Sequence, residues 1–124
     1  MKIELSASSQ DYLEAVLDLS SVKDKIRSVD IAERLNVSRA SVNRAMKVLK
    51  EVGYITQERY QDIFLTEAGR EAGEAIRMRH EALKSFLVDV LGVDAQTAEE
   101  DACRMEHSLS IESLSKLQEF LTQR

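Results

Sequence analysis

The sequence predicts a mainly α-helical protein with one short β-hairpin, organised as two small domains at residues 1–70 and 71–124. Three observations predict this class. The chain has no proline in 124 residues, apolar residues recur at helical spacing along most of it, and residues that favour helix N-caps precede the apolar stretches. A hydrophobic content of 44% with 31% charged residues is typical of a folded globular chain rather than a disordered one.

Charge is unevenly distributed along the chain, although the net value is only −5. Residues 23–61 hold nine Lys or Arg and five acids, a local excess of +4, whereas residues 1–22 carry −3 and residues 62–124 carry −6. A basic middle between acidic ends indicates a segment that binds a polyanion, attached to a part that prefers cations or other protein. Ordinary variation in surface charge would explain the same distribution equally well.

The chain holds one cysteine and no apolar run of about 18 residues, the length that a membrane span needs. A single cysteine cannot form an intramolecular disulfide, and the amino terminus lacks the pattern of a signal peptide. We therefore expect a protein of the reducing cytoplasm that has no membrane partner.

Residues 8–19 predict a first amphipathic helix, in which Ser8 and Ser9 are capping residues and apolar side chains follow at helical spacing. Asp11 and Glu14 stand three residues apart on this helix, so both carboxylates can point the same way. Their place near its amino end also suits the helix dipole, which is a sufficient explanation for two acids there.

Residues 28–53 predict two helices joined by a turn. Ser28 can cap a short helix from Val29 to Leu35, and Ser38 can cap a longer helix that Gly53 ends. At about 100° per residue, the longer helix places its apolar side chains on one face and a polar, basic set on the other. Its apolar face is expected to pack on a core, which leaves the basic face exposed.

A β-hairpin is predicted directly after this basic helix. Residues 54–59 and 63–66 are rich in β-branched and aromatic side chains and flank a predicted turn at residues 60–62. This order of elements is that of a winged helix-turn-helix, which places its second helix in the major groove and its hairpin along the phosphates. A helix-turn-helix used only for packing is the alternative.

The predicted DNA contacts lie on the exposed face of the longer helix and at the hairpin tip. We expect Asn43 and Arg44 to contact base edges, where amide and guanidinium groups can pair with bases. Arg39, Lys47 and Arg59 are expected to contact phosphates. The full set of predicted DNA-binding residues is Ser38, Arg39, Ala40, Ser41, Asn43, Arg44, Lys47 and Arg59.

Three further helices are predicted after the hairpin: a long helix to Leu91, capped by Thr66 and ended by Gly92; Ala95 to Leu109, capped by Asp94; and a last helix capped by Ser110. Because most helix-turn-helix proteins present two recognition helices to half-sites about 34 Å apart, we expect this helical domain to form a homodimer interface. Packing of its apolar surface against the first domain is the alternative. The apolar stripe of the last helix consists of Ile111, Leu114, Leu117, Phe120 and Leu121.

The helix predicted over residues 95–109 brings three side chains that can bind metals onto one face. Cys103, Glu106 and His107 fall within an arc of about 100°. The pattern is weak by itself, because a single cysteine usually packs as a small hydrophobe and Glu and His on a charged helix are usually solvated.

Six blocks of the chain occur in a distinctive order and spacing: DYLEA at 11–15, DIAERL at 30–35, LTEAGR at 65–70, RHE at 79–81, FL at 86–87 and ACRMEHSLS at 102–110. In this respect the chain resembles the metal-dependent repressors of the diphtheria toxin repressor and manganese transport regulator family. The resemblance covers nearly the whole chain. It implies a metal-dependent DNA-binding regulator in the two-domain form, without the SH3-like third domain of longer members.

In that family the metal site joins the first helix, the long helix and the fifth helix. The resemblance therefore implies six metal ligands, which are Asp11, Glu14, His80, Cys103, Glu106 and His107. The chemistry is consistent, because the set contains both histidines and the only cysteine and supplies N, O and S donors. Its acids would repel one another in the empty protein, so binding of a divalent cation would be coupled to ordering.

The resemblance mixes two branches of the family, which leaves the metal open. Asp11 and Glu14 resemble the manganese type, which can hold two ions, whereas Cys103 is the residue of the iron type. Oxygen ligands suit Mn²⁺ and a thiolate shifts preference toward Fe²⁺, Co²⁺ or Zn²⁺. We expect Mn²⁺ or Fe²⁺, with Co²⁺, Zn²⁺ and Cd²⁺ as substitutes.

The ancillary metal site of the iron branch is altered in this chain. Lys84 stands where that branch has an acid, and Glu99 stands where it has a histidine. Lys84 would repel a nearby cation, and residues 99–101 are expected to form a solvated acidic run.

These features predict a homodimeric regulator, a repressor of metal-uptake genes, that binds a palindromic double-stranded operator when loaded with metal. Two alternatives stay open. Cys103 would be an oxidation-sensing thiol in the first, although no second cysteine is present to resolve a sulfenic acid. The second is a two-metal hydrolase, for which the sequence contains no evident substrate-binding motif. We expect the protein not to be an enzyme.

Overall fold

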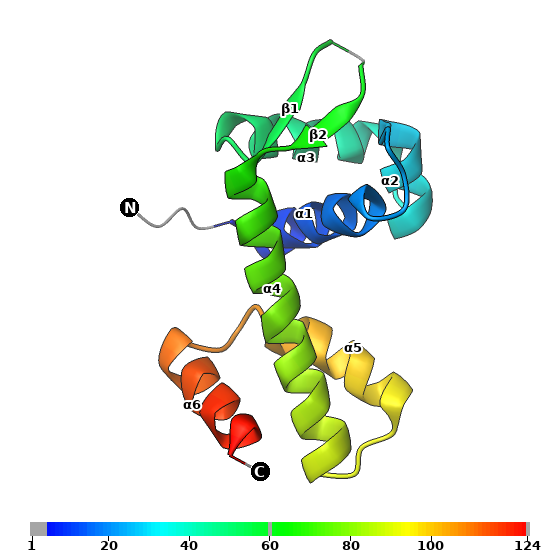
Figure 1. Ribbon diagram of the computed structural model, residues 1–124. Helices are drawn as coiled ribbons and strands as arrows, with labels where there is room; N and C mark the ends of the chain where they lie inside the picture. The colour runs from blue at the N-terminus through cyan, green and yellow to red at the C-terminus, as the bar shows by residue number, and fades with distance from the viewer. Residues whose placement is uncertain (1–4, 60, 124) are drawn as a thin grey trace. The chain divides into compact units, whose positions relative to one another are not determined.

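The computed structural model of the chain describes residues 5–59 and 61–123, so Tyr60 of the predicted turn lies outside the described residues. The chain forms two compact units, residues 1–74 and 75–124. Helices make up most of both units, and the sheet in the described part of the chain is one two-stranded hairpin (Figure 1). This confirms the predicted mainly α-helical class with a small hairpin.

The first unit is built on three helices, α1 (Ala7–Ser20), α2 (Ser28–Leu35) and α3 (Arg39–Glu51). Apolar side chains from these helices and from the hairpin converge on one core. Burying a side chain of this size stabilises the fold by about 1.5–3 kcal/mol, so these contacts hold the helices in place. The fully buried members are Leu13, Val16, Ile31, Val42, Met46, Leu49, Ile55 and Ile63.

The helix N-termini partly match the prediction. The hydroxyl of Ser38 accepts a hydrogen bond from the Ser41 N–H at 3.1 Å and caps α3 as predicted. Ser6 caps α1 in the same way, so the predicted caps Ser8 and Ser9 lie inside the helix. The predicted cap Ser28 is likewise the first residue of α2, because Ser28 has helical backbone and the extended residue before it takes the cap position.

The hairpin consists of β1 (Ile55–Gln57) and β2 (Ile63–Leu65), which pair antiparallel with Ile55 opposite Leu65 and Gln57 opposite Ile63. Both strands are shorter than predicted. The segment before α2 extends the sheet by one bridge, in which the Ile63 N–H donates to the Ile26 carbonyl at 2.8 Å. Gly53, with φ 86°, ends α3 as predicted.

Helix α4 (Glu67–Ser85) starts directly after the hairpin. The Thr66 hydroxyl accepts from the Gly69 N–H at 3.0 Å and donates to the Gly53 carbonyl at 2.6 Å, so Thr66 caps this helix as predicted. A Cβ on Gly69 would clash with the carbonyl oxygen of Tyr54. The close approach of the first turn of α4 to the backbone just before β1 therefore requires a glycine at position 69.

The second unit contains the rest of α4, the π-helical turn η1 (Phe86–Val90), α5 (Ala95–Met105) and α6 (Ile111–Thr122). The predicted helix to Leu91 is therefore α-helical only to Ser85. Beyond that residue the turn widens, and the Leu91 N–H donates to the Phe86 carbonyl at 3.2 Å. Asp94 and Ser110 cap α5 and α6 as predicted.

The apolar stripe of α6 is divided between the core and the surface of the second unit. Leu114 is buried with Leu83 and Ala102, and Leu117 packs against them. Ile111 and Phe120 are 61% and 47% exposed. Part of the predicted dimer surface is thus used within the unit, and the rest faces outward.

Among the described residues, no helix has the length and apolar character needed to span a bilayer.

Candidate metal centre and DNA-binding face

Glu106 is the centre of the candidate metal site, because its side chain is fully buried and lies between the two histidines of the chain. Its Oε2 is 3.6 Å from Nδ1 of His80, and its Oε1 is 3.5 Å from Nε2 of His107. The side chains of His80 and His107 are only 8% and 13% exposed. A carboxylate removed from water needs compensating positive charge, from protonated imidazole or from a cation.

Cys103 completes a set of three possible ligands with His80 and Glu106. One ligand atom from each lies within 4.8 Å of the others. Imidazole nitrogen, thiolate sulfur and carboxylate oxygen together form a donor set that suits a divalent transition metal. The residues of the second unit therefore fit the ion that the family resemblance implies. Cys103 is exposed, whereas the other two ligands are buried.

Local structure at the end of α5 differs from the prediction. The helix ends at Met105 instead of Leu109, so Glu106 and His107 stand in the turn beyond it. The backbone tightens there, because the N–H groups of Ser108 and Leu109 both donate to the Met105 carbonyl, at 3.0 and 3.2 Å. The predicted helical face was wrong in this detail, yet Glu106 keeps its helical hydrogen bond to Ala102 and still lies beside Cys103.

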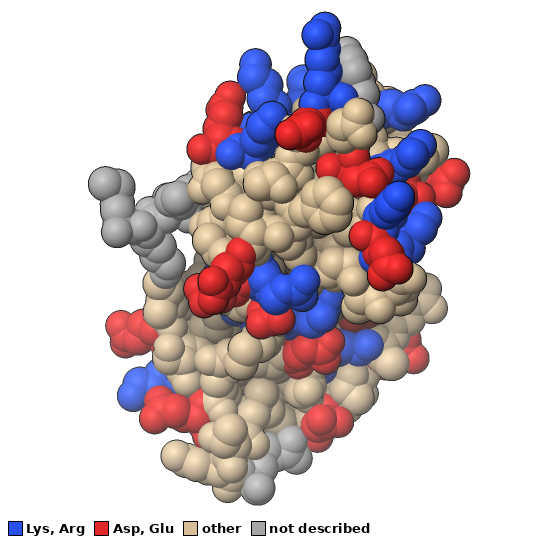
Figure 2. Space-filling view, turned by 45° about the horizontal axis from the view of Figure 1, so that its top comes forward, with Lys and Arg blue, Asp and Glu red and all other residues tan. Residues whose placement is uncertain are grey.

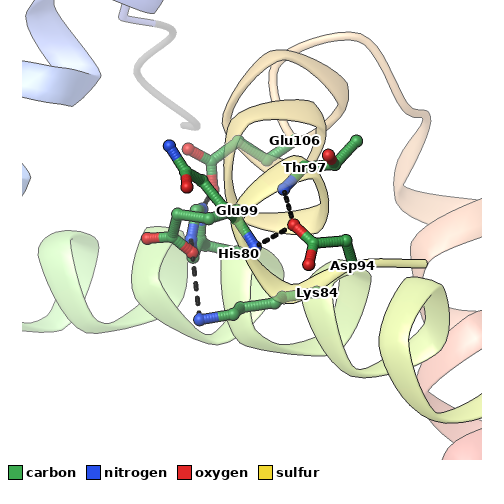
Figure 3. Close-up of polar contacts among 7 residues, drawn as sticks. His80, Lys84, Asp94, Thr97, Glu99 and Glu106 are labelled. Atoms are coloured by element: carbon green, nitrogen blue, oxygen red, sulfur yellow. Dashed lines mark hydrogen bonds and ion pairs between the residues drawn. The ribbon is translucent and has the colours of Figure 1, made fainter. Parts of the chain in front are cut away.

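Glu99 contacts His80 from the other side of the imidazole ring. Its Oε2 lies 2.7 Å from Nε2 of His80 and 3.4 Å from Nζ of Lys84 (Figure 3). The hydrogen bond to His80, followed by the positive charges of His80 and Lys84, lowers the pKa of the Glu99 carboxyl despite partial burial. Glu99 was predicted to be part of a solvated acidic run; its side chain is exposed as expected, but its contact with the buried His80 was not predicted.

A spacing signal for Glu99 was present in the sequence. Glu99, Cys103 and Glu106 are separated by four and three residues, which places them on one face of α5 and of the turn that follows it. His80 and Lys84 have the same four-residue spacing on α4. Only the packing of α5 on α4 decides that these two faces meet.

Asp11 and Glu14, the other predicted ligands, lie on α1 in the first unit. Asp11 is exposed and Glu14 is half-buried. Their part in a metal site stays a prediction.

The predicted DNA-binding residues form an exposed face on the first unit. All of them except the half-buried Ser41 are exposed, as is Arg59 beyond β1. The guanidinium of Arg44 donates to the Ser41 hydroxyl at 3.2 Å, and the Ser28 hydroxyl donates to the Asn43 side chain at 3.4 Å. Figure 2 shows several Lys and Arg side chains, with acids among them, over the part of the first unit that carries α3 and the hairpin.

One lysine of α3 holds the hairpin to the helix. Nζ of Lys50 donates to the Gln57 carbonyl at 2.7 Å, so the end of α3 and β1 are joined by a direct hydrogen bond. A basic helix and a hairpin held in this way can contact a duplex together, which is the arrangement of a winged helix-turn-helix.

Residues 4–63 match the sequence model of the iron-dependent repressor N-terminal DNA-binding domain, and residues 66–124 match that of the iron-dependent repressor metal-binding and dimerisation domain. The chain belongs to this family of metal-dependent transcriptional repressors. The resemblance to the diphtheria toxin repressor and manganese transport regulator family is thereby confirmed.

Individual relatives agree with this assignment. The chain is 39% identical over 118 residues to an uncharacterised helix-turn-helix-type transcriptional regulator of Methanocaldococcus jannaschii, and the match covers 94% of each chain. It is 37% identical over 113 residues to the transcriptional regulator MntR of Salmonella typhimurium, covering 91% of this chain and 71% of that one.

A solved structure shares the fold. A manganese-dependent transcriptional repressor in complex with manganese superposes with a TM-score of 0.82 at 29% identity. The match covers 92% of this chain and 52% of the other, so the chain spans about half the length of that protein.

The family and these relatives are transcriptional regulators, not enzymes, as predicted. The comparisons give no support to a thiol-based redox sensor or to a two-metal hydrolase.

Proposed function

We propose that this repressor-family protein binds a palindromic operator as a homodimer when Mn²⁺ or Fe²⁺ is bound, and that it represses metal-uptake genes. The observation that carries the proposal is the buried Glu106 carboxylate, which lies between His80 and His107 and beside Cys103. A buried carboxylate without a nearby cation lowers the stability of the folded protein, and the donor atoms around Glu106 fit a divalent metal. Since the partner is genomic DNA, we place the protein in the cytoplasm.

The remaining ligands would come from the first unit, as the family resemblance implies. Asp11 and Glu14 lie one turn apart on α1, the helix whose apolar side chains pack in the core with α2 and α3. A bound cation would supply the positive charge that lets these carboxylates and Glu106 share one site. Ligation by α1 would thus couple metal binding to the position of α3, and the metal acts by shifting the population toward the DNA-binding form.

The metal is set by the softness of the donors. The five carboxylate or imidazole ligands suit Mn²⁺, whereas the Cys103 thiolate favours Fe²⁺ and accepts Co²⁺, Zn²⁺ or Cd²⁺. An anaerobic titration with each ion, read out by DNA binding, ranks these metals. A Cys103→Asp variant is expected to shift the ranking toward Mn²⁺, because it replaces a soft ligand by a hard one.

A homodimer is supported by the match of residues 66–124 to a metal-binding and dimerisation domain. It is also supported by exposed apolar side chains on α4 and α6, where Met78 is 62% and Phe120 is 47% exposed. Two copies related by a two-fold axis would present two α3 helices to half-sites about one helical turn apart.

Selection of binding sites from random duplex DNA in the presence of Mn²⁺ tests the whole proposal. The selected sites are expected to be palindromic. Glu106→Gln, which keeps the shape of the side chain and removes its charge, is expected to abolish metal-stimulated binding to the operator. The matched control is Glu112→Gln on the exposed face of α6, which should bind as the unchanged protein does. A Glu106→Gln variant that shifted operator DNA normally at low metal would contradict the proposal.

A further inference from the structure

The imidazole of His80 lies between two carboxylates, those of Glu99 and Glu106. Nε2 is 2.7 Å from Oε2 of Glu99, and Nδ1 is 3.6 Å from Oε2 of Glu106. Figure 3 shows the ring of His80 on α4, with Glu99 reaching it from α5 and Glu106 from the turn that follows α5. Each ring nitrogen of His80 therefore faces the carboxylate of a different residue.

A neutral imidazole has one N–H and one nitrogen with a lone pair, and the hydrogen bond made by one nitrogen decides which is which. An ionised carboxylate can only accept a hydrogen bond. At 2.7 Å from Glu99, Nε2 of the neutral ring is held as the N–H donor. Nδ1 then keeps its lone pair on the side of Glu106 and Cys103, where a cation would bind.

We propose that Glu99 is a positioning residue, which fixes the tautomer and the orientation of His80 so that Nδ1 is presented to a divalent cation held with Glu106 and Cys103. This inference rests on the proposed metal site. Histidine ligands of metals generally donate their second N–H to a carboxylate or carbonyl, and loss of that partner weakens metal binding.

Lys84 restricts Glu99 to this supporting role. Its Nζ lies 3.4 Å from the same Oε2 that faces His80, so a positive charge already stands on the Nε2 side of the ring. A second cation there would be repelled by the ammonium group. The side chains of Lys84 and Glu99 are 38% and 50% exposed, and ion pairs as exposed as this contribute little to folding. The ion pair with Lys84 therefore adds little to stability, and its position keeps Glu99 from binding a second cation.

The tautomer is tested first in the metal-free protein by the ¹⁵N shifts of the histidine rings, at alkaline pH where the rings are neutral. The signals of His80 are assigned by their loss in His80→Gln. The unchanged protein is expected to show the Nε2–H tautomer at His80. Glu99→Ala should produce a mixture, whereas Glu99→Gln should retain the Nε2–H form because its amide oxygen still accepts. A mixture in the unchanged protein would overturn the proposal without any reference to metal.

Metal affinity is tested with Co²⁺ as the probe, followed by its absorption spectrum. Glu99→Ala is expected to weaken Co²⁺ binding by about 10- to 100-fold, and Glu99→Gln should recover most of that loss. The control is Glu100→Ala, an exposed neighbour on the same helix, which should leave the affinity unchanged. The unfolding midpoints of the metal-free variants are measured to show that each variant is folded under the conditions of the titration.

The outcomes separate this inference from the proposed function. Equal losses in Glu99→Ala and Glu99→Gln would make Glu99 a direct ligand and overturn the positioning role, as would an unchanged affinity in Glu99→Ala. Failure of the unchanged protein to bind Co²⁺, Mn²⁺ or Fe²⁺ would instead refute the metal site itself.

Discussion

The carbonyl oxygen of Tyr54 occupies the space that a Cβ atom on Gly69 would need. That contact places the first turn of α4 against the residue that precedes β1, and the Thr66 N–H donates to the same carbonyl at 3.1 Å. The join between the hairpin and α4 therefore requires a glycine at position 69, because only a hydrogen atom fits there as the side chain.

Gly69→Ala is expected to destabilise the protein by about 2–3 kcal/mol, because backbone atoms must move to relieve the overlap. Gly73→Ala is the matched control on the same helix. Its Cβ would lie 3.2 Å from Cδ2 of Leu17, the flexible end of a side chain that can adjust, and alanine favours the helix by about 1 kcal/mol. Urea denaturation, monitored by circular dichroism, measures the free energy of unfolding of both variants. Equal stability of the two variants would show that the Tyr54 contact is not needed.

The fold was largely predictable because most of its signals are local. Ser38, Thr66, Asp94 and Ser110 each cap the helix assigned to them, since a hydroxyl or carboxylate needs only an N–H two or three residues ahead. The prediction failed at the start of α1, where serines stand at positions 6, 8 and 9. A serine at any of these positions can cap a helix, and only the path of the backbone determines which one does so.

The candidate site was less predictable, because it depends on packing between helices. The family resemblance brought together His80, Cys103 and Glu106, which the second unit places within reach of one ion. Nothing local indicated that α5 ends at Met105 or that Glu99 faces His80, nineteen residues earlier in the chain. The contribution of α1 to the site stays a prediction.

Asp30 makes the stability of the first unit depend on pH. Its carboxylate accepts from Nζ of Lys23 at 2.8 Å and from the Arg27 N–H at 2.9 Å. The hydrogen bond from Lys23, then that from the backbone, lowers the pKa of Asp30 below 3.8. A lowered pKa in the folded state means that this stabilisation is present above about pH 4 and is lost as the pH falls toward the folded value.

Asp30→Asn is expected to reduce the free energy of unfolding by about 1 kcal/mol at pH 7, the usual value of a carboxylate at a helix amino end. The difference from the unchanged protein should shrink between pH 4 and pH 3, because the carboxyl group is then protonated in the unfolded chain. Urea denaturation at several pH values measures this difference in the free energy of unfolding. Asp24→Asn, at an exposed position, serves as the control. A difference that stayed constant down to pH 3 would remove Asp30 from the pH dependence.

Replacing Lys47 and replacing Arg44 are expected to weaken DNA binding in different ways. Lys47 is an exposed ammonium on α3 that is predicted to contact a phosphate. Lys47→Ala should therefore weaken binding to all sequences alike and reduce the slope of log K against log salt by about 0.9. Arg44→Ala removes a predicted base contact, so it should cost about 1–3 kcal/mol on the operator and relax specificity at one position. Lys116→Ala on α6, where the lysine pairs with Glu119 at 3.9 Å, is the control and should leave the slope unchanged. If Lys47→Ala kept the full salt dependence, α3 would have to lie on the duplex in another orientation.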